Sequence, residues 1–260
     1  MVSLLSFQSF WNEISASFQS FWDQISASFV KTFITEDRWK QLLDGLGVTI
    51  EISFFAVILG IVLGFIVATV RSSYDKLIAG RKCRTAGERV LKFFNTICNI
   101  YITIIRGTPM VVQLMIMYYI IFSSSRNGIL AAVLSFGINS GAYVAEIVRS
   151  GIMSLDQGQL EAGRSLGFSY SQTMIYIIIP QAFKNVLPAL GNEFIVLLKE
   201  TSVAGYVALK DVTYVGNLIR SRTYEAFFPL ITVAIIYLVI VMILSYGLKR
   251  LERRLRNSER

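Results

Sequence analysis

Four long runs of this chain contain no charged residue, and each is long enough to cross a lipid bilayer. They cover residues 52–70, 107–125, 127–145 and 227–247. About 20 apolar residues in a helix span the hydrocarbon core of a membrane. Charged residues make up 16% of the sequence, whereas soluble domains carry roughly 25%. The chain is therefore expected to be an all-α integral membrane protein.

One more span, the fourth in chain order, is expected within about 174–204, where charged residues and two prolines punctuate the apolar sequence. The second span is expected to be interrupted, because residues 93–105 are also uncharged and Pro109 follows them. A proline inside a helix removes a hydrogen bond and clashes with the preceding turn. The pattern predicts one broken helix, or an elbow followed by a span.

Two glycines lie four residues apart in the first run, as Gly60-x-x-x-Gly64. This spacing lets another helix approach closely in a membrane. In so apolar a run it can equally arise by chance, so the sequence leaves both interpretations open.

Basic residues gather beside the apolar runs, at 71–92 and in the tail 251–260. Cytoplasmic loops of membrane proteins carry an excess of lysine and arginine. Both segments are therefore predicted to be cytoplasmic. Five spans then put the N-terminus outside and the C-terminus in the cytoplasm, and residues 205–226 become an external re-entrant or amphipathic segment.

The composition excludes several classes of site. The chain has no histidine and two cysteines, Cys83 and Cys98, so it cannot assemble a disulfide framework, a Cys/His metal site or a Ser-His-Asp triad. It also lacks a Walker-type phosphate loop. The chain itself is expected to be no enzyme and to bind no metal or cofactor. Its net charge of +8 fits basic cytoplasmic loops rather than nucleic acid.

Residues 1–45 form a separate segment that opens on a tandem repeat. SFQSFWNEISA at 6–16 returns as SFQSFWDQISA at 17–27. Eleven residues make about three helical turns, so the apolar residues form one stripe. The stripe comprises Phe7, Phe10, Trp11, Ile14, Phe18, Phe21, Trp22 and Ile25. The segment is too polar to span, and we expect an extracytoplasmic amphipathic helix that lies at the membrane interface or packs on a partner.

Several polar residues fall within or beside the apolar runs: Glu51, Asn139, Glu146, Asn192, Glu193, Lys199 and Glu200. Polar groups inside a membrane are costly and usually face a pathway or a packed interior. Some of them can instead snorkel or form pairs at span ends. An ion channel or a gradient-driven carrier with a relay through Glu146 and Glu193 is the alternative function that these residues leave open.

A recognisable motif starts in the polar segment after the third span, about 154–172, and continues to residue 180. Glu161-Ala162-Gly163, Gly167 and Ile177-x-Ile179-Pro180 resemble the EAA signature of the membrane subunits of ATP-binding cassette importers. Four further blocks resemble the polar amino acid permeases of the histidine, glutamine and arginine type: RGTPMVVQ at 106–113, SGAYVAEIVRSGI at 140–152, LPALGNEF at 187–194 and LLKETS at 197–202.

This resemblance covers most of residues 46–250 and implies a five-span type I importer domain that moves amino acids across the cytoplasmic membrane of a prokaryote. It implies a second permease subunit, identical or different, two cytoplasmic ATPase subunits that hold ATP and Mg, and an extracytoplasmic binding protein. In that family the signature forms a coupling helix that docks on the ATPase subunit. The residues implied in coupling are Glu161, Ala162, Gly163, Gly167 and Pro180. Small side chains there permit close approach, and Glu161 near a helix start could cap it or accept a hydrogen bond.

The solute path is predicted from the helix breaks and from one helical face. Breaks at 107–109 and 188–192 expose oriented backbone groups, and positions 139, 143 and 146 share a face. The residues expected to line or border the path are Thr108, Asn139, Tyr143, Glu146, Asn192 and Glu193. Glu146 is the expected partner for an ammonium group, and its pairing with Arg149 or Arg106 is the structural alternative.

Overall fold

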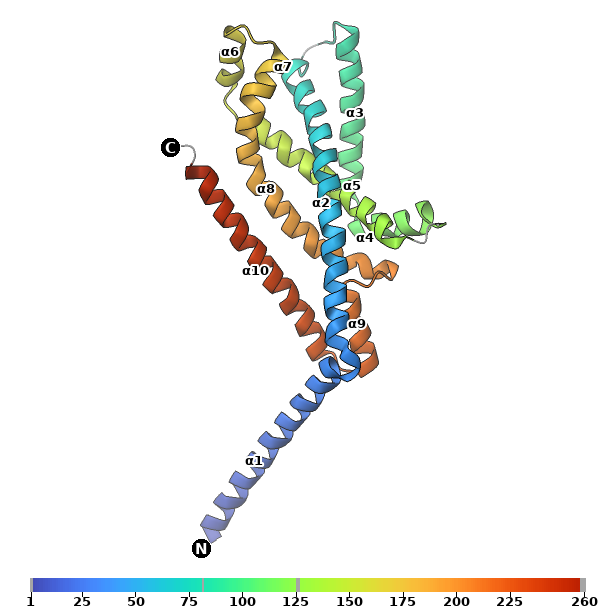
Figure 1. The fold of residues 1–260 in the computed structure, drawn as a ribbon, viewed down its shortest axis with the longest axis vertical. Coiled ribbons are helices and arrows are strands. Elements are labelled where there is room, and N and C mark those ends of the chain that lie inside the picture. The colour runs from blue at the N-terminus through green and yellow to red at the C-terminus, as the bar shows by residue number, and fades with distance from the viewer. Residues whose placement is uncertain (1, 81, 125–126, 258–260) are drawn as a thin grey trace.

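The computed structural model describes a protein built of helices joined by short connections (Figure 1). The described residues are 2–80, 82–124 and 127–257, with side chains described for 15–80, 82–124, 127–156 and 158–255. Within them no strand occurs, as the apolar runs predicted. The last three residues of the predicted basic tail lie outside the described residues.

The membrane-spanning part is built from five crossings. They are α2 (Arg38–Leu77), the bent pair α3 (Ala86–Gly107) and α4 (Met110–Ile116), α5 (Gly128–Met153), α8 (Ile179–Glu200) and α10 (Phe227–Asn257). Four helical stretches are long and apolar enough to cross a membrane, and the bent pair makes a fifth. The prediction of five spans is confirmed.

Shorter elements connect these crossings. They are η1 (Val30–Ile34), η2 (Thr35–Asp37), η3 (Met117–Ile121), α6 (Gln157–Ser165), α7 (Tyr170–Thr173), η4 (Met174–Ile178), η5 (Thr201–Val207) and α9 (Val212–Thr223). The segment that the sequence placed outside the membrane at 205–226 thus contains a helix, α9. It packs against α2 and α10.

The first span is much longer than its apolar run. α2 has 40 residues and continues through Arg71 and Asp75, so the prediction of a loop that begins at 71 is wrong. The helix can continue because both charged side chains pair with groups on α5. Only a short connection then separates the end of α2 from the start of α3 at Ala86.

Among the described helices, α2 and α5 pack most extensively against each other. A Cβ atom added to Gly60 would lie 2.9 Å from the Cβ of Ser140, and one added to Gly141 would lie 3.1 Å from the Cβ of Leu63. Gly64 meets Val144 in the same way. The glycine pair of the first run is therefore a packing surface rather than a chance spacing, because the backbones could not approach if these residues had side chains.

The predicted break at Pro109 is present. α3 and α4 meet there at 107°, and Thr108 and Pro109 are extended rather than helical. α4 packs on the core through Leu114, which is fully buried beside Phe136 of α5, whereas η3, which follows α4, has no buried residue. The sequence left open whether this was one broken helix or an elbow followed by a span. The structure shows a bent pair, in which the long helix α3 precedes the bend and the shorter α4 and η3 follow it.

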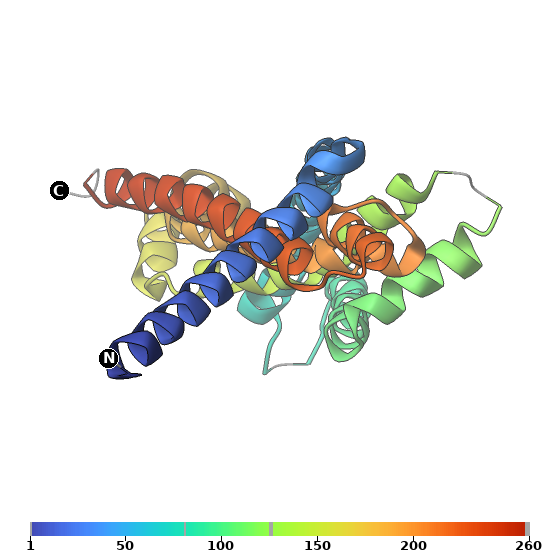
Figure 2. The same ribbon diagram turned by 90° about the horizontal axis from the view of Figure 1, so that it is seen from below.

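The two ends of the bundle carry different elements. α6 and α7 lie at the same end as the C-terminus of α2 and the N-terminus of α3, whereas α9 and the start of α2 lie at the other (Figure 1). α1 (Val2–Phe29) leaves the bundle at this second end. Figure 2 shows that it runs obliquely away from the other helices. The predicted amphipathic helix is thus present as a separate arm.

Candidate functional site

The predicted coupling segment folds as a short helix at one end of the bundle. α6 begins at Asp156, whose carboxylate accepts a hydrogen bond from the backbone N of Gly158 at 2.8 Å. Glu161 lies in the middle of the helix and is exposed. The expectation that Glu161 caps the helix is therefore wrong. Its carboxylate is instead presented on the surface, next to the exposed Ala162.

The two glycines of this segment have different structural roles. Gly163 is buried, and a Cβ atom there would lie 2.5 Å from Thr173 Cγ2 and 3.1 Å from Ile177 Cδ1. Gly167 has a φ of +87° and open space around it. Gly163 thus lets α6 pack on α7 and η4 of its own chain, and Gly167 supplies the left-handed conformation that ends the helix.

The motif continues directly into the fourth span. Ser169 caps α7 in a capping box with Gln172, and Pro180 is the second residue of α8, which directly follows η4. α7, η4 and α8 follow one another without an interruption. A displacement of α6 can therefore reach α8 through this continuous helical segment.

A four-membered charge network joins α2 to α5 near the same end. Glu146 forms an ion pair with Arg71 and lies 3.5 Å from Nη2 of Arg149. Arg149 also contacts Asp75, with 3.1 Å between Nη1 and Oδ2. The expected pairing of Glu146 with Arg149 is present. Its second arginine partner is Arg71 and not Arg106.

Glu146 nevertheless lines a cavity of about 510 Å³. The cavity lies between α3, α5 and α8 and is bordered by Arg106, Glu146, Ile147, Ser150, Gly151, Ser154, Asn185 and Ala189. The guanidinium of Arg106 stands 5.1 Å from the ring centre of Tyr143. A cation, an anion and an aromatic ring therefore meet at one place, although Glu146 already has two arginine partners there.

Thr108 and Asn139 meet through a residue that the sequence interpretation missed. Gln113 accepts a hydrogen bond from Asn139 Nδ2 at 3.1 Å, and its own amide donates to Thr108 Oγ1 at 2.8 Å. The same amide donates to the carbonyl of Ile105 at 2.7 Å. Asn139 is buried, so this cluster fixes the elbow against α5.

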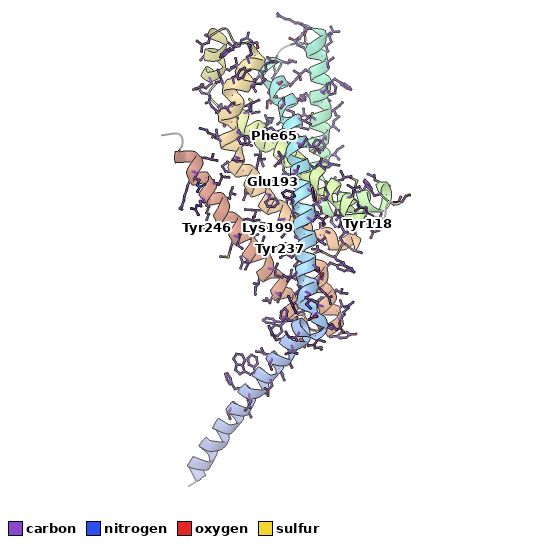
Figure 3. The ribbon with its side chains drawn as sticks, in the orientation of Figure 1. Phe65, Tyr118, Glu193, Lys199, Tyr237 and Tyr246 are labelled. Atoms are coloured by element: carbon purple, nitrogen blue, oxygen red, sulfur yellow. The ribbon has the colours of Figure 1, made fainter. Side chains whose placement is uncertain are left out.

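The remaining predicted path residues lie on α8. Glu193 accepts a hydrogen bond from Ser140 Oγ at 2.9 Å, which ties α8 to α5, whereas Asn192 is exposed. Figure 3 labels Glu193 and Lys199, which follow each other along α8. The six predicted residues therefore do not form one cluster. Glu146 borders the cavity with Tyr143 nearby, Thr108 and Asn139 meet through Gln113, and Asn192 and Glu193 lie on α8.

The sequence offered partial signals for the residues that were missed. Arg71 and Asp75 are one helical turn apart at the end of an apolar run, a spacing that places them on one face. Gln113 is an amide within an uncharged stretch directly after the proline break. Ser140 follows Asn139 on α5, but its hydrogen-bond partner is Glu193 of α8. Spacing along the sequence could not identify that partner.

Comparison with known proteins gives the family. A model of the "Binding-protein-dependent transport system inner membrane component" matches residues 84–257. The glutamine transport system permease protein GlnP of Escherichia coli (strain K12) is 36% identical over 219 residues, which cover 83% of this chain and 93% of GlnP. The arginine transport system permease protein ArtQ of Bacillus subtilis (strain 168) is 35% identical over 221 residues, 84% of this chain and 94% of ArtQ.

Solved structures share the fold. A crystal structure of an amino acid ABC transporter with histidines superposes with a TM-score of 0.73 at 39% identity, over 85% of this chain and 98% of that one. The inward-facing MetNI methionine ABC transporter gives a TM-score of 0.70 at 20% identity, over the same shares. The chain is a multi-pass inner-membrane protein and belongs to the family of inner-membrane components of binding-protein-dependent transport systems.

Proposed function

We propose that this chain is the permease subunit of an ATP-driven importer of polar amino acids. The observation that carries the proposal is the cavity that both Arg106 and Glu146 border. A free amino acid presents a carboxylate and an ammonium group, and each needs a partner of opposite charge when it loses water. The relatives named for glutamine and arginine transport support this class of solute.

ATP hydrolysis would take place on two separate cytoplasmic subunits, which hold ATP and Mg, while this chain binds no cofactor itself. The exposed face of α6, with Glu161 and Ala162, would dock on such a subunit. Since α6 packs on η4 through Gly163 and η4 continues into α8, movement of α6 would displace Asn185 and Ala189 in the cavity wall. Closure of the ATPase subunits would thereby switch the path between inward- and outward-facing states.

The complex would contain a second permease subunit, identical or different, and an extracytoplasmic binding protein that delivers the solute. Residues 46–250 would form the transport domain, with 1–45 outside the membrane and 251–260 as a cytoplasmic tail. A gradient-driven carrier with Glu146 as a relay is not favoured, because Glu146 is held between Arg71 and Arg149.

The proposed topology has the N-terminus outside and the C-terminus in the cytoplasm. It is supported by the position of α6 at the same end of the bundle as the basic connection between α2 and α3 (Figure 1). The test uses Cys at Ala79 or at Ser20, both exposed, in a chain with Cys83 and Cys98 replaced by Ser. An impermeant thiol reagent should label position 20 in intact cells and position 79 only after permeabilisation. The reverse pattern would overturn the topology and leave the transport function standing.

Reconstitution tests the transport function itself. The chain, its ATPase partner and the binding protein are incorporated into vesicles, and uptake of labelled glutamine, arginine and histidine is measured with and without ATP. Uptake should require ATP and the binding protein, and vanadate should stop it. Uptake that follows an ion gradient and persists without the ATPase subunit would overturn the proposal.

A further inference from the structure

α1 carries an aromatic face that lies outside the transport fold. Phe18, Phe21 and Trp22 are 61%, 55% and 54% exposed, and all three point to the side defined by the eleven-residue repeat. The opposite side of the helix carries Ser20 and Asp23. This arm lies before residues 46–250, the proposed transport domain, so the transport function does not account for its pattern.

The arm joins the bundle among other exposed aromatic residues. Phe29, the last residue of α1, packs against Phe228 of α10 with 6.4 Å between ring centres. Near this joint Tyr224 is 94% exposed, and Phe227 and Trp39 are exposed as well. Aromatic side chains gather in this way at the boundary between membrane and water. The joint from which α1 leaves the bundle thus has the aromatic composition typical of a bilayer surface.

The joint between α1 and α2, which consists of η1 and η2, changes the direction of the chain. Helical hydrogen bonding changes register in η1, and Glu36 and Asp37 both have positive φ angles, of 58° and 52°. A regular helix would carry α1 onward along the axis of α2. The interruption instead allows the arm to turn along the membrane surface.

The charges of the arm indicate which kind of surface it fits. The first 30 residues contain no lysine or arginine, and their two charged residues are Glu13 and Asp23. Helices that bind anionic lipids carry basic residues on the polar face, whereas lipid-packing sensors pair bulky apolar residues with an uncharged polar face. The polar face here is rich in serine and glutamine and carries two acidic residues but no basic one, so it is closer to the second kind and has no attraction for anionic lipid.

We infer that α1 lies on the bilayer surface with its aromatic face in the boundary between headgroups and acyl chains, and that it binds lipid of low negative charge. The proposed topology makes this the outer leaflet, and only that choice of leaflet rests on the proposed function. A second copy of the chain is the other occupant to consider, because an eleven-residue repeat can form a right-handed coiled coil. Coiled-coil seams favour leucine, isoleucine and valine over large rings, so lipid fits the face better.

Spin labels on the full-length chain test the inference. Single cysteines replace Phe18 or Ile25 on the aromatic face and Ser20 or Ala27 on the opposite face, in a chain with Cys83 and Cys98 changed to Ser. Each variant is placed in nanodiscs of neutral lipid, which expose both leaflets and make the result independent of topology. Collision with oxygen reports lipid, and collision with a nickel chelate reports water. A label at Val62, an exposed position on the apolar α2, gives the lipid reference.

Labels 18 and 25 should resemble the reference, with high oxygen and low nickel accessibility, whereas labels 20 and 27 should show the reverse. In nanodiscs that contain anionic lipid the contrast should be equal or smaller. If all four labels are accessible to water while the label at Val62 still reports lipid, the inference is overturned and the transport fold is unaffected. Spin–spin broadening between copies at positions 18 and 25 would overturn it in favour of a second copy, and a contrast that appears only with anionic lipid would overturn the preference for neutral lipid.

Discussion

Glu146 of α5 forms an ion pair with Arg71 of α2 inside the helix bundle, 75 residues away in the sequence. The side chains are 26% and 16% exposed, so neither charge is well hydrated. The pair allows α2 to remain helical beyond its apolar run and binds it to α5 at the end of the bundle that carries α6. It also places a carboxylate at the wall of the cavity.

Replacement of Glu146 by Gln should destabilise the protein, because Arg71 would keep its charge in a poorly hydrated position without a carboxylate partner. The expected loss is about 2 kcal/mol in the free energy of unfolding. Thermal unfolding of the purified protein in detergent measures it. The double variant E146Q/R71Q should recover part of the loss, because it removes the orphaned charge as well. Losses that simply add would show that the two side chains do not interact.

The same Glu146→Gln variant separates the structural role from a role in solute recognition. Reconstituted complexes that retain assembly are compared with wild type for uptake of glutamine and arginine. If Glu146 contacts the solute, the preference between these amino acids should change, since a positive side chain loses a partner and a neutral one does not. Reduced uptake with an unchanged preference would assign Glu146 to structure alone.

Glu161→Lys should uncouple transport from ATP hydrolysis without unfolding the protein. Glu161 is exposed on α6, so its reversal alters the charge of the presented surface and leaves internal contacts intact. Co-purification of the ATPase subunit and ATP-dependent uptake should both fall. Ala79→Lys, which adds a charge at the exposed connection of the same end, serves as the control and should behave as wild type. Equal behaviour of both variants would remove α6 from the docking surface.

Gly163→Val and Ala162→Val should differ although the positions are adjacent. The added side chain at Gly163 would collide with Thr173, and overpacking of this kind costs about 1–3 kcal/mol. At Ala162 the new methyl groups face the exterior, so the change in stability should stay within about 0.5 kcal/mol. Thermal unfolding of the isolated permease compares them. A stable Gly163→Val protein would contradict the packing of α6 on α7 and η4.

Asp211 should make stability depend on pH. It is buried at the start of α9, where Oδ1 and Oδ2 accept hydrogen bonds of 3.0 Å from the backbone N atoms of Tyr214 and Thr213. Burial raises the pKa of Asp211, and these hydrogen bonds offset the shift only in part. Since the folded state holds the proton more tightly than the unfolded state, the contribution of Asp211 is complete below pH ~4 and declines as pH rises through the folded pKa.

Asp211→Asn removes this titration. The difference in unfolding free energy between the two proteins should move in favour of Asn as the pH is raised from about 4 to about 7. Urea titrations at several pH values measure it, and comparison of the pair cancels the other titrating groups. A difference that moves in favour of Asp over this range would mean that the folded pKa is lowered.

The sequence predicted the features that depend on local chemistry. Runs of apolar residues located the spans, Pro109 located the elbow, and the spacing of Gly60 and Gly64 pointed to a close crossing. The features that it missed depend on partners far along the chain. The end of α2 could not be placed, because Arg71 is tolerated in the helix only through Glu146, and the orientation of Gly163 depends on Thr173.

The predicted path residues show the same limit. Thr108 was selected for its place at a helix break, and Asn139 and Glu193 also because polar groups are costly in a membrane. Each of the three has a hydrogen-bond partner in the structure. Spacing could identify residues that need partners but could not name the partners. Gln113 and Ser140 become visible only when the helices are in place.

The elbow between α3 and α4 is completed by residues of its own segment. The hydroxyl of Thr108 donates to the carbonyl of Ile104 at 2.8 Å, and Gln113 donates to that of Ile105, so the backbone groups released by the bend are satisfied locally. A corner of this kind does not wait for another subunit to supply the missing donors. A single chain can therefore form these two bonds by itself.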